Sequence, residues 1–182
     1  YAAVMNFFLE GSIRLSTPYI ITLTDSKELL GLLLGILNLG IVVGGVVMFV
    51  WGGTRPRVHG IMLGLLFRAF WLMVYGIVRT PTTLGIAMFF LLLSTPIIDA
   101  SFMSLLQTKI PADLQGRVFS LLFQMMYIGN PLSFLLTGLI VDNVLEPAVG
   151  VGGWSLVAPI VGDSAGSGMG LFILINGAII FA

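Results

Sequence analysis

The sequence predicts an all-α membrane protein with six transmembrane helices, on three observations. Of its 182 residues, 58% are hydrophobic and 9% are charged, whereas soluble domains carry about 25% charged residues. The apolar residues form unbroken runs near the ~20 residues that a spanning helix needs, not the alternation over ~10 residues of a transmembrane β-strand. Most charged residues fall in the gaps between these runs. Lipid is therefore the expected solvent for most of the surface.

The runs define six predicted helices. They span residues 1–23, 29–51, 60–78, 84–106, 118–141 and 168–182. The last would be about 22 Å long at 1.5 Å per residue, short of the ~30 Å hydrocarbon core, and the chain opens at Tyr1 inside an apolar run. We therefore expect a piece of a longer protein, cut at both ends. The Gly-, Pro- and Ser-rich stretch 142–167 is more typical of a packed external cap than of a free linker.

The basic residues of the gaps predict the orientation, because cytoplasmic loops carry an excess of Lys and Arg. The second and fourth gaps hold four of the six basic gap residues. Their charged residues are Arg55, Arg57, Lys109, Asp113 and Arg117. This bias places both gaps in the cytoplasm, and the simplest role of the two arginines in the second gap is to hold that hairpin on the inner face. His59 is interpreted as a surface residue, since the chain has no second His to share a metal with.

Glycines and prolines inside the segments predict close packing and kinks. In the second segment Gly31 and Gly35, and then Gly40 and Gly44, are each four apart, a spacing that lets membrane helices approach closely. Three further segments carry an internal proline, which removes a helix hydrogen bond and favours a kink. These are Pro18, Pro96 and Pro131. Such kinks either line a cavity or fit a helix to its neighbours.

Four ionisable residues lie at membrane depth, where a charge at a helix centre costs roughly 2.5–3.5 kcal/mol and pairing is expected. Glu10 and Arg14 are four apart on one helix, with the acid first, which is the favourable order. Arg68 and Asp99 lie at similar depths of roughly 10–12 Å in the antiparallel hairpin of the third and fourth segments. We therefore expect two ion pairs, Glu10–Arg14 and Arg68–Asp99.

Two interpretations of these charges stay open. Glu10 and Asp99 are candidates for proton coupling, with Arg14 and Arg68 as charge partners, because a carboxylate taken out of water can take up and release a proton as its surroundings change. Alternatively, each pair is static and locks helices together. Polar side chains in the apolar runs have the same two interpretations, as part of a substrate path or as interhelical hydrogen bonds. These are Asn38, Gln124 and Asn130.

Several function classes are disfavoured. The chain has no nucleophile elbow, P-loop or His–Glu metal pair, so we expect no enzyme, no cofactor and no metal site. The absence of Cys excludes disulfides and thiolate metal sites. A net charge of zero argues against a nucleic-acid partner, which requires a basic face. The expected partners are the lipid bilayer and a small-molecule substrate.

Several stretches resemble one transporter family. VWGGTRPRVHGIMLG at 50–64 resembles the link between helices eight and nine in a bacterial branch of the major facilitator superfamily, of the macrolide-efflux and enterobactin-exporter type. KIPADLQGRVFS at 109–120 resembles the loop between its helices ten and eleven. PLSFLLTGLIVDNVLEPAV at 131–149 is similar to its eleventh helix and following turn, and GSGMGLFILINGAI at 166–179 to the start of its last helix. The resemblance covers nearly the whole chain in the right order.

The resemblance implies the C-terminal six-helix half of a twelve-helix fold whose halves are related by an axis along the membrane normal. The N-terminal half of the same chain is then a further partner. Helices seven, eight, ten and eleven line the family's cavity, and Arg68 falls on a supporting helix. The residues placed near the substrate path are Glu10, Asn38, Asp99 and Gln124. The family's cytoplasmic loop carries an Asp that latches the inward gate through arginine; residues 52–60 hold no acid, so a latch here needs a partner from another helix.

The expected function is that of a multi-pass secondary transporter of the bacterial inner membrane. It would export an amphipathic small molecule, such as a drug, macrolide or siderophore, by proton antiport and alternating access. The alternative is a non-transporting membrane module that binds a partner or handles lipid. A similar six-helix segment upstream in the gene would favour transport.

Overall fold

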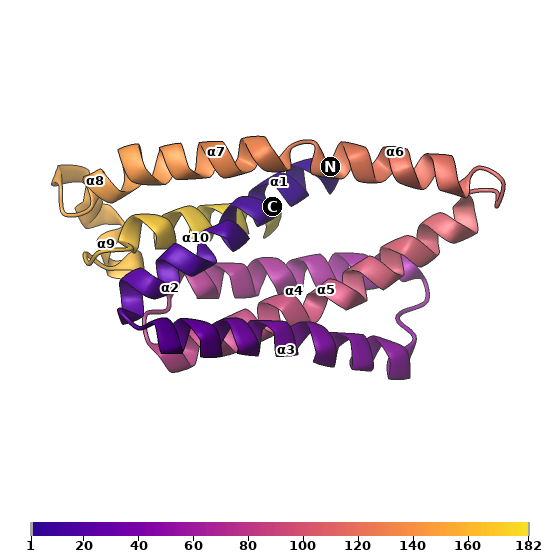
Figure 1. Cartoon of the computed structure of the whole chain (residues 1–182), viewed down its shortest axis with the longest axis horizontal. Helices are drawn as coiled ribbons and strands as arrows, with labels where there is room; N and C mark the ends of the chain where they lie inside the picture. The colour runs from indigo at the N-terminus through magenta and orange to yellow at the C-terminus, as the bar shows by residue number, and fades with distance from the viewer. Residues whose placement is uncertain (1, 182) are drawn as a thin grey trace.

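The computed structural model describes residues 2–181, with side chains from residue 6 onward. Every regular element in that range is helical, which confirms the predicted all-α class. The long helices lie side by side along the long axis of the molecule, and the turns between them gather at its two ends (Figure 1). The polypeptide is thus a bundle with two chemically distinct ends and long apolar sides.

The first predicted helix is found as two. α1 (Ala2–Arg14) and α2 (Ser16–Thr24) replace the continuous helix expected over 1–23. Pro18 explains the break, because it has no N–H for the carbonyl of Arg14 and its ring crowds that carbonyl. The hydrogen-bond pattern resumes with the Tyr19 N–H, which donates to the Leu15 carbonyl at 2.9 Å.

The next three helices are continuous and begin slightly earlier than predicted. They are α3 (Lys27–Trp51), α4 (Arg57–Ile77) and α5 (Pro81–Lys109). The early starts of α3 and α5 follow from caps: Ser26 Oγ accepts from the Leu29 N–H at 3.2 Å, and Thr80 Oγ1 accepts from the Thr83 N–H at 3.4 Å. Pro96 lies within α5 without ending it.

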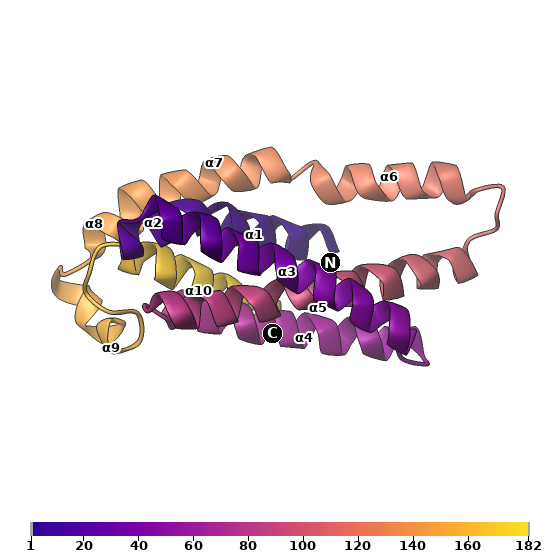
Figure 2. The ribbon, with the colours of Figure 1, turned by 60° about the horizontal axis from the view of Figure 1, so that its bottom comes forward.

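The fifth predicted helix is both longer than expected and interrupted. α6 (Gln115–Tyr127) and α7 (Asn130–Ile140) are separated by a two-residue break, and the helical path continues through a π-helical turn (Val141–Leu145) into α8 (Glu146–Ala148). Figure 2 shows α6 and α7 end to end along one edge of the bundle. Pro131 removes the hydrogen bond to the carbonyl of Tyr127, the last residue of α6, so the same physical cause acts here as at Pro18.

Four helices are long and apolar enough to cross a membrane: α3, α4, α5 and the interrupted run Gln115–Ala148. These helices and the composition are those of a helical membrane protein. The two remaining apolar stretches are shorter, since α1 and α2 have 13 and 9 residues and α10 (Ser167–Phe181) has 15.

The stretch between α8 and α10 packs against the bundle. It contains a 3-10 turn (Gly152–Leu156) and α9 (Ala158–Val161). Trp154 is buried, and its indole N–H donates to the Gly162 carbonyl at 2.9 Å. The Glu146 carboxylate accepts from the N–H groups of Gly166 at 3.3 Å and Met169 at 3.0 Å. It therefore ties the end of the fifth segment to the start of the last helix.

Glycines set the closest helix contacts. A Cβ at Gly40 or Gly44 of α3 would fall on the backbone carbonyl of Phe89 or Leu93 of α5. The other predicted pair behaves differently, because a Cβ at Gly31 or Gly35 would meet nothing within 4 Å. One of the two glycine pairs in α3 therefore packs against another helix of this chain, whereas the other pair contacts no described residue of a neighbouring helix.

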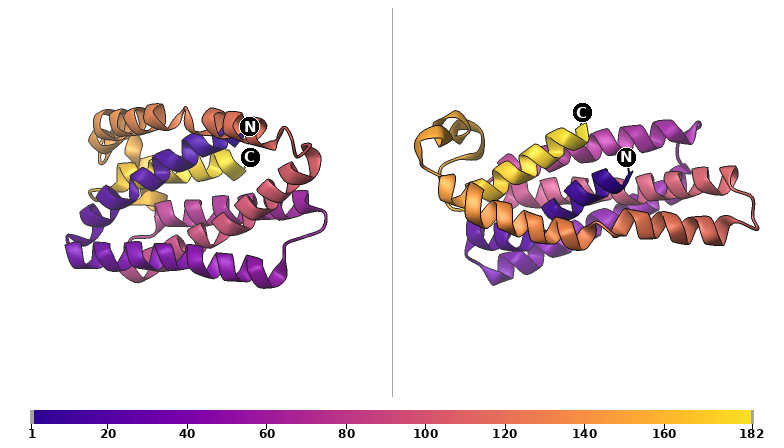
Figure 3. Two further views of the ribbon diagram at one scale, coloured as in Figure 1. Left: turned by 45° about the vertical axis from the view of Figure 1, so that its right-hand side comes forward. Right: turned by 90° about the horizontal axis from the view of Figure 1, so that it is seen from above.

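α5 packs between α3 and α4, α10 packs on α4, and α1 packs on α7 (Figure 3). Where α4 and α10 cross, a Cβ at Gly76 would lie 2.6 Å from the Gly170 carbonyl oxygen, and the reverse distance is also 2.6 Å. At one end of this crossing the Tyr19 hydroxyl donates to the carbonyl of Gly76 at 3.2 Å. Arg79 Nη2 donates there to Ser167 Oγ at 3.0 Å.

Gly44→Ala is expected to destabilise the protein by about 1–3 kcal/mol, because its Cβ must push α3 away from the α5 backbone. Gly35→Ala is the matched control on the same helix. It is expected to be neutral or stabilising by up to ~1 kcal/mol, since Ala is the better helix former. Thermal unfolding in detergent, followed by circular dichroism, compares the two. Equal shifts in Tm would contradict the assigned contact.

Glu146→Ala is expected to cost roughly 0.5–2 kcal/mol, because it removes the acceptor of two N–H groups at the start of α10. The loss loosens the stretch 150–166, so limited proteolysis should cut there faster than in the parent protein. Asp163→Ala, at an exposed acid of the same stretch, should leave the cleavage rate unchanged. Unchanged cleavage in Glu146→Ala would show that the carboxylate does not hold this stretch.

Candidate functional site

A hollow lined by both charged and apolar side chains lies where the two interrupted helical segments meet. It has a volume of about 380 Å³ and is lined by Glu10, Arg14, Asn130, Pro131 and Phe134. Arg14 is the last residue of α1, and Asn130 is the first residue of α7. The hollow therefore lies beside both helix breaks, and it brings together three predicted site residues from two distant parts of the sequence.

The predicted ion pair between Glu10 and Arg14 is formed. The Arg14 Nε lies 3.9 Å from the Glu10 Oε2, and the side chains are 63% and 23% exposed, respectively. Among the side chains that the structure describes, this is the one ion pair. The long distance and the exposed guanidinium make this a loose pair, so another cation can displace Arg14 from Glu10.

Amide groups add to the polarity of this region. The Oδ1 atoms of Asn6 and Asn130 are buried and accept no hydrogen bond from the described residues. Asn6 lies one turn before Glu10 on the same face of α1, since residues four apart share a helix face. Phe134 supplies an apolar wall beside them. The hollow thus offers a carboxylate and a guanidinium next to an apolar surface, which suits an amphipathic ligand.

The other faces of α1 are fixed by hydrogen bonds to neighbouring helices. Ser133 Oγ of α7 donates to the Phe7 carbonyl, and a Cβ at Gly11 would lie 3.0 Å from that same hydroxyl. On another face Asn176 of α10 donates to the Phe8 carbonyl at 3.1 Å and to Ser12 Oγ at 2.8 Å. These contacts leave the face of Glu10 and Arg14 directed at the hollow.

No direct ion pair joins Arg68 to Asp99 among the side chains that the structure describes. Arg68 is 7% exposed; its Nε donates to Ser94 Oγ at 3.2 Å and its Nη2 to Thr95 Oγ1 at 2.7 Å. Asp99 is exposed. The register of the hairpin explains this difference from the predicted pair. Gly60 lies against Ser101 and Gly64 against Ile98, so one further turn along α4 the guanidinium faces the two hydroxyls that precede Asp99.

The remaining predicted residues lie outside the hollow. Asn38 and Gln124 are exposed, and the Asn38 amide donates to the Leu34 carbonyl of its own helix at 2.7 Å. The charged residues of the second and fourth gaps lie at one end of the bundle, where α3 and α5 end (Figure 1). Arg55, Lys109, Asp113 and Arg117 are exposed there, and Arg57 is half-buried as the first residue of α4.

Two further polar residues near this site, Asn6 and Asn176, were not predicted from the sequence. Asn6 belongs to the polar face of α1, and Asn176 anchors α10 to α1. Both interrupt apolar runs in the same way as Asn38, so the signal was present. Asn6 also stands four residues before Glu10, a spacing that marks a shared face.

Comparison of the chain with protein-family models, with curated proteins and with solved structures found no match. The function therefore has to be inferred from the geometry of the site.

The new partner of Arg68 can be tested by double-mutant cycles. Arg68→Met and Thr95→Val should show a coupling energy of about 1.5–3 kcal/mol, because the hydrogen bond has a charged donor. Arg68→Met and Asp99→Asn should show a smaller coupling energy, because no hydrogen bond joins these two side chains. The free energy of unfolding in detergent supplies both cycles. A larger coupling energy between Arg68 and Asp99 than between Arg68 and Thr95 would contradict the assigned hydrogen bond and support the predicted ion pair.

Proposed function

We propose that this protein is a proton-coupled secondary transporter that exports an amphipathic small molecule by alternating access. The observation that supports this most is the hollow at Glu10, because it combines a loose ion pair with two helix breaks in an apolar bundle. Ionisable residues at membrane depth are costly and mark substrate or proton pathways by default. Interrupted helices in membranes occur where they line cavities or pack on protein.

In this proposal Glu10 carries the proton, and proton and substrate compete for one site. With Glu10 ionised, its carboxylate holds Arg14 or a cationic group of the substrate. A proton on the carboxylate removes that charge, so Arg14 and the substrate lose their partner and the substrate is released. Release of the proton on the opposite side of the membrane restores the Glu10 carboxylate. Proton and substrate thereby exchange across the membrane with no net reaction of the substrate.

The proposal also includes a second six-helix half of the same protein, with this chain as helices seven to twelve of a major facilitator fold. α6 has no buried residue, which is unusual for a helix in a finished bundle. Asn38, Asp99 and Gln124 expose polar groups on long apolar helices, where lipid is a poor solvent for them. A neighbouring half, with a water-filled path between the halves, gives both features a partner.

The charge at the two ends supports an orientation within a bacterial inner membrane. The end at which α3 and α5 terminate carries Arg55, Arg57, Lys109 and Arg117. The opposite end carries only Lys27 and Arg79 among basic residues. By the rule that cytoplasmic loops are enriched in Lys and Arg, the first of these ends faces the cytoplasm.

Transport is tested with the intact protein in sealed vesicles under an imposed proton gradient. A panel of amphipathic dyes, macrolides and siderophores provides the substrates. Glu10→Gln is expected to reduce gradient-driven movement to the level of empty vesicles, because the amide takes up no proton. Asp99→Asn should retain gradient dependence, because its carboxylate lies outside the hollow.

Asp163→Asn is the matched control, since it makes the same carboxylate-to-amide change at an exposed acid between α9 and α10. It should move substrate as the parent protein does. Substrate movement that depends neither on the proton gradient nor on Glu10 would show that the Glu10–Arg14 pair is only structural. No movement of any compound would favour the non-transporting membrane module instead.

A further inference from the structure

We propose that a groove between α3 and α5 binds one acyl chain of a zwitterionic phospholipid. The groove is separate from the hollow at Glu10 and shares no lining residue with it. The inference therefore does not depend on the transport proposal.

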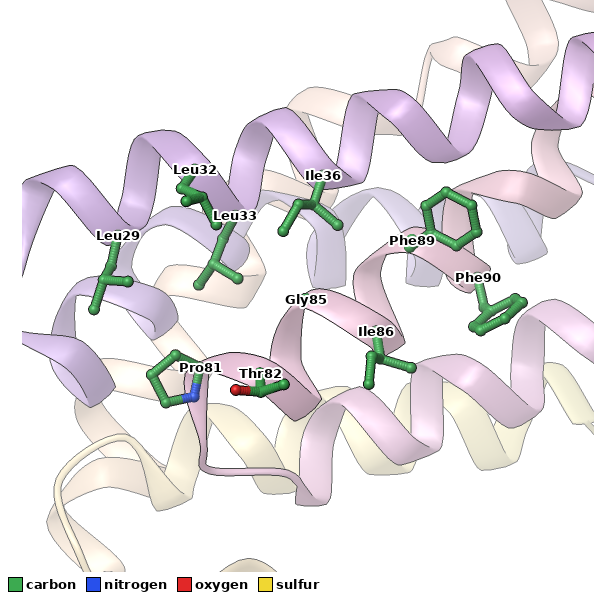
Figure 4. Close-up of a pocket in the computed structure, with 10 residues that line it drawn as sticks. All are labelled: Leu29, Leu32, Leu33, Ile36, Pro81, Thr82, Gly85, Ile86, Phe89 and Phe90. Atoms are coloured by element: carbon green, nitrogen blue, oxygen red, sulfur yellow. The ribbon is translucent and has the colours of Figure 1, made fainter.

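The groove is large and apolar. Its volume is about 560 Å³, and it runs between the first turns of α3 and the first turns of α5 (Figure 4). Leu32 and Ile36 of α3 form part of one wall, and Ile86 of α5 forms part of the other. Thr82 is its one lining residue with a polar side chain. An apolar cavity of this kind has no partners for ordered water.

The position of the groove matches the path of a lipid chain. Leu29 lies in the first turn of α3, and Pro81 is the first residue of α5, so the mouth lies where both helices begin. From there the groove follows α3 for roughly 10 Å, as far as Ile36, and α5 for roughly 14 Å, as far as Phe90, at 1.5 Å per residue. Both helices are long and apolar enough to span a membrane. The mouth therefore lies at the interface and the rest in the hydrocarbon core, where acyl chains are the available ligand.

The inner end of the groove is rigid. Phe90 stacks on Trp71 of α4, with ring centroids 4.6 Å apart and an interplanar angle of 17°. Phe89 meets Phe90 edge to face at 5.3 Å. Gly85 keeps α3 close to α5, since a Cβ there would lie 3.2 Å from Leu33 Cδ2. A preformed apolar slot loses little entropy when a chain enters it.

Two charged residues in the same helix turn as Leu29 are the basis for the headgroup in this proposal. Lys27 and Glu28 are adjacent and exposed in the first turn of α3. Together they complement a headgroup that carries both a phosphate and an ammonium, because each charge finds an opposite partner. A free fatty acid lacks the ammonium, and an anionic phospholipid leaves Glu28 facing negative charge. Phosphatidylethanolamine has both groups and is the ligand on which we base the test.

The test compares two leucines of α3. Leu32 is 57% exposed and lines the groove, whereas Leu39 is 56% exposed and does not. They are seven residues apart, so they project from nearly the same face of the helix. Leu32→Trp fills the groove, and Leu39→Trp adds the same bulk two turns further along. Ile86→Trp, on the opposite wall, is a second blocking variant should Leu32→Trp fail to fold.

The full chain is reconstituted in bilayers of phosphatidylethanolamine, phosphatidylglycerol and palmitate, extracted in mild detergent and weighed by native mass spectrometry. We expect one phosphatidylethanolamine on the parent chain and on Leu39→Trp, and roughly tenfold less on each blocking variant. Equal retention by Leu32→Trp and Leu39→Trp, or no retained lipid on the parent chain, would overturn the groove as the site. Retention of phosphatidylglycerol or palmitate in its place would overturn the headgroup assignment.

Discussion

Direct contact between helix backbones at glycines is the constraint on which this bundle depends. Lipid is as apolar as a leucine side chain, so burial from water does not drive membrane helices together, and close fit has to do so. Gly40 and Gly44 bring α3 onto the backbone of α5, and Gly76 and Gly170 bring α4 and α10 together. These crossings fix the register of neighbouring helices. In the same way, the contacts of Gly60 and Gly64 with α5 set the partners of Arg68.

The polar site depends on the two proline breaks within this frame. Pro18 ends α1 at Arg14, and Pro131 ends α6 three residues before Asn130. Each break leaves backbone carbonyls without a helical partner, which lipid cannot satisfy. Arg14 and Pro131, which stand beside the two breaks, both line the hollow, so the irregular backbone lies next to the charged side chains. The rest of α1 is held by hydrogen bonds from Ser133 and Asn176.

The bundle separates two kinds of binding surface. The hollow on α1 and α7 offers charge and amide groups, and the groove on α3 and α5 offers hydrocarbon and aromatic rings. Their difference has one origin, the kind of residue that fills the space beside a close helix contact. At Gly11 the neighbours are hydroxyls of α7, and at Gly85 they are aliphatic side chains of α3. A protein built in this way can bind lipid on one pair of helices and a polar ligand on another.

Features that depend on neighbours along the chain were predictable. Composition and run length predicted the all-helical class and the positions of α3, α4 and α5, the prolines marked both interruptions, and a spacing of four residues predicted the Glu10–Arg14 pair. Features that depend on register between helices were not. Equal depth suggested Asp99 as the partner of Arg68, but the contacts of Gly60 and Gly64 align it with Ser94 and Thr95. The same spacing of glycines occurs twice in α3, and only packing against α5 distinguishes Gly40 and Gly44 from Gly31 and Gly35. Local spacing specifies a helix face, whereas the residue that this face meets is decided by how neighbouring helices slide and rotate into contact.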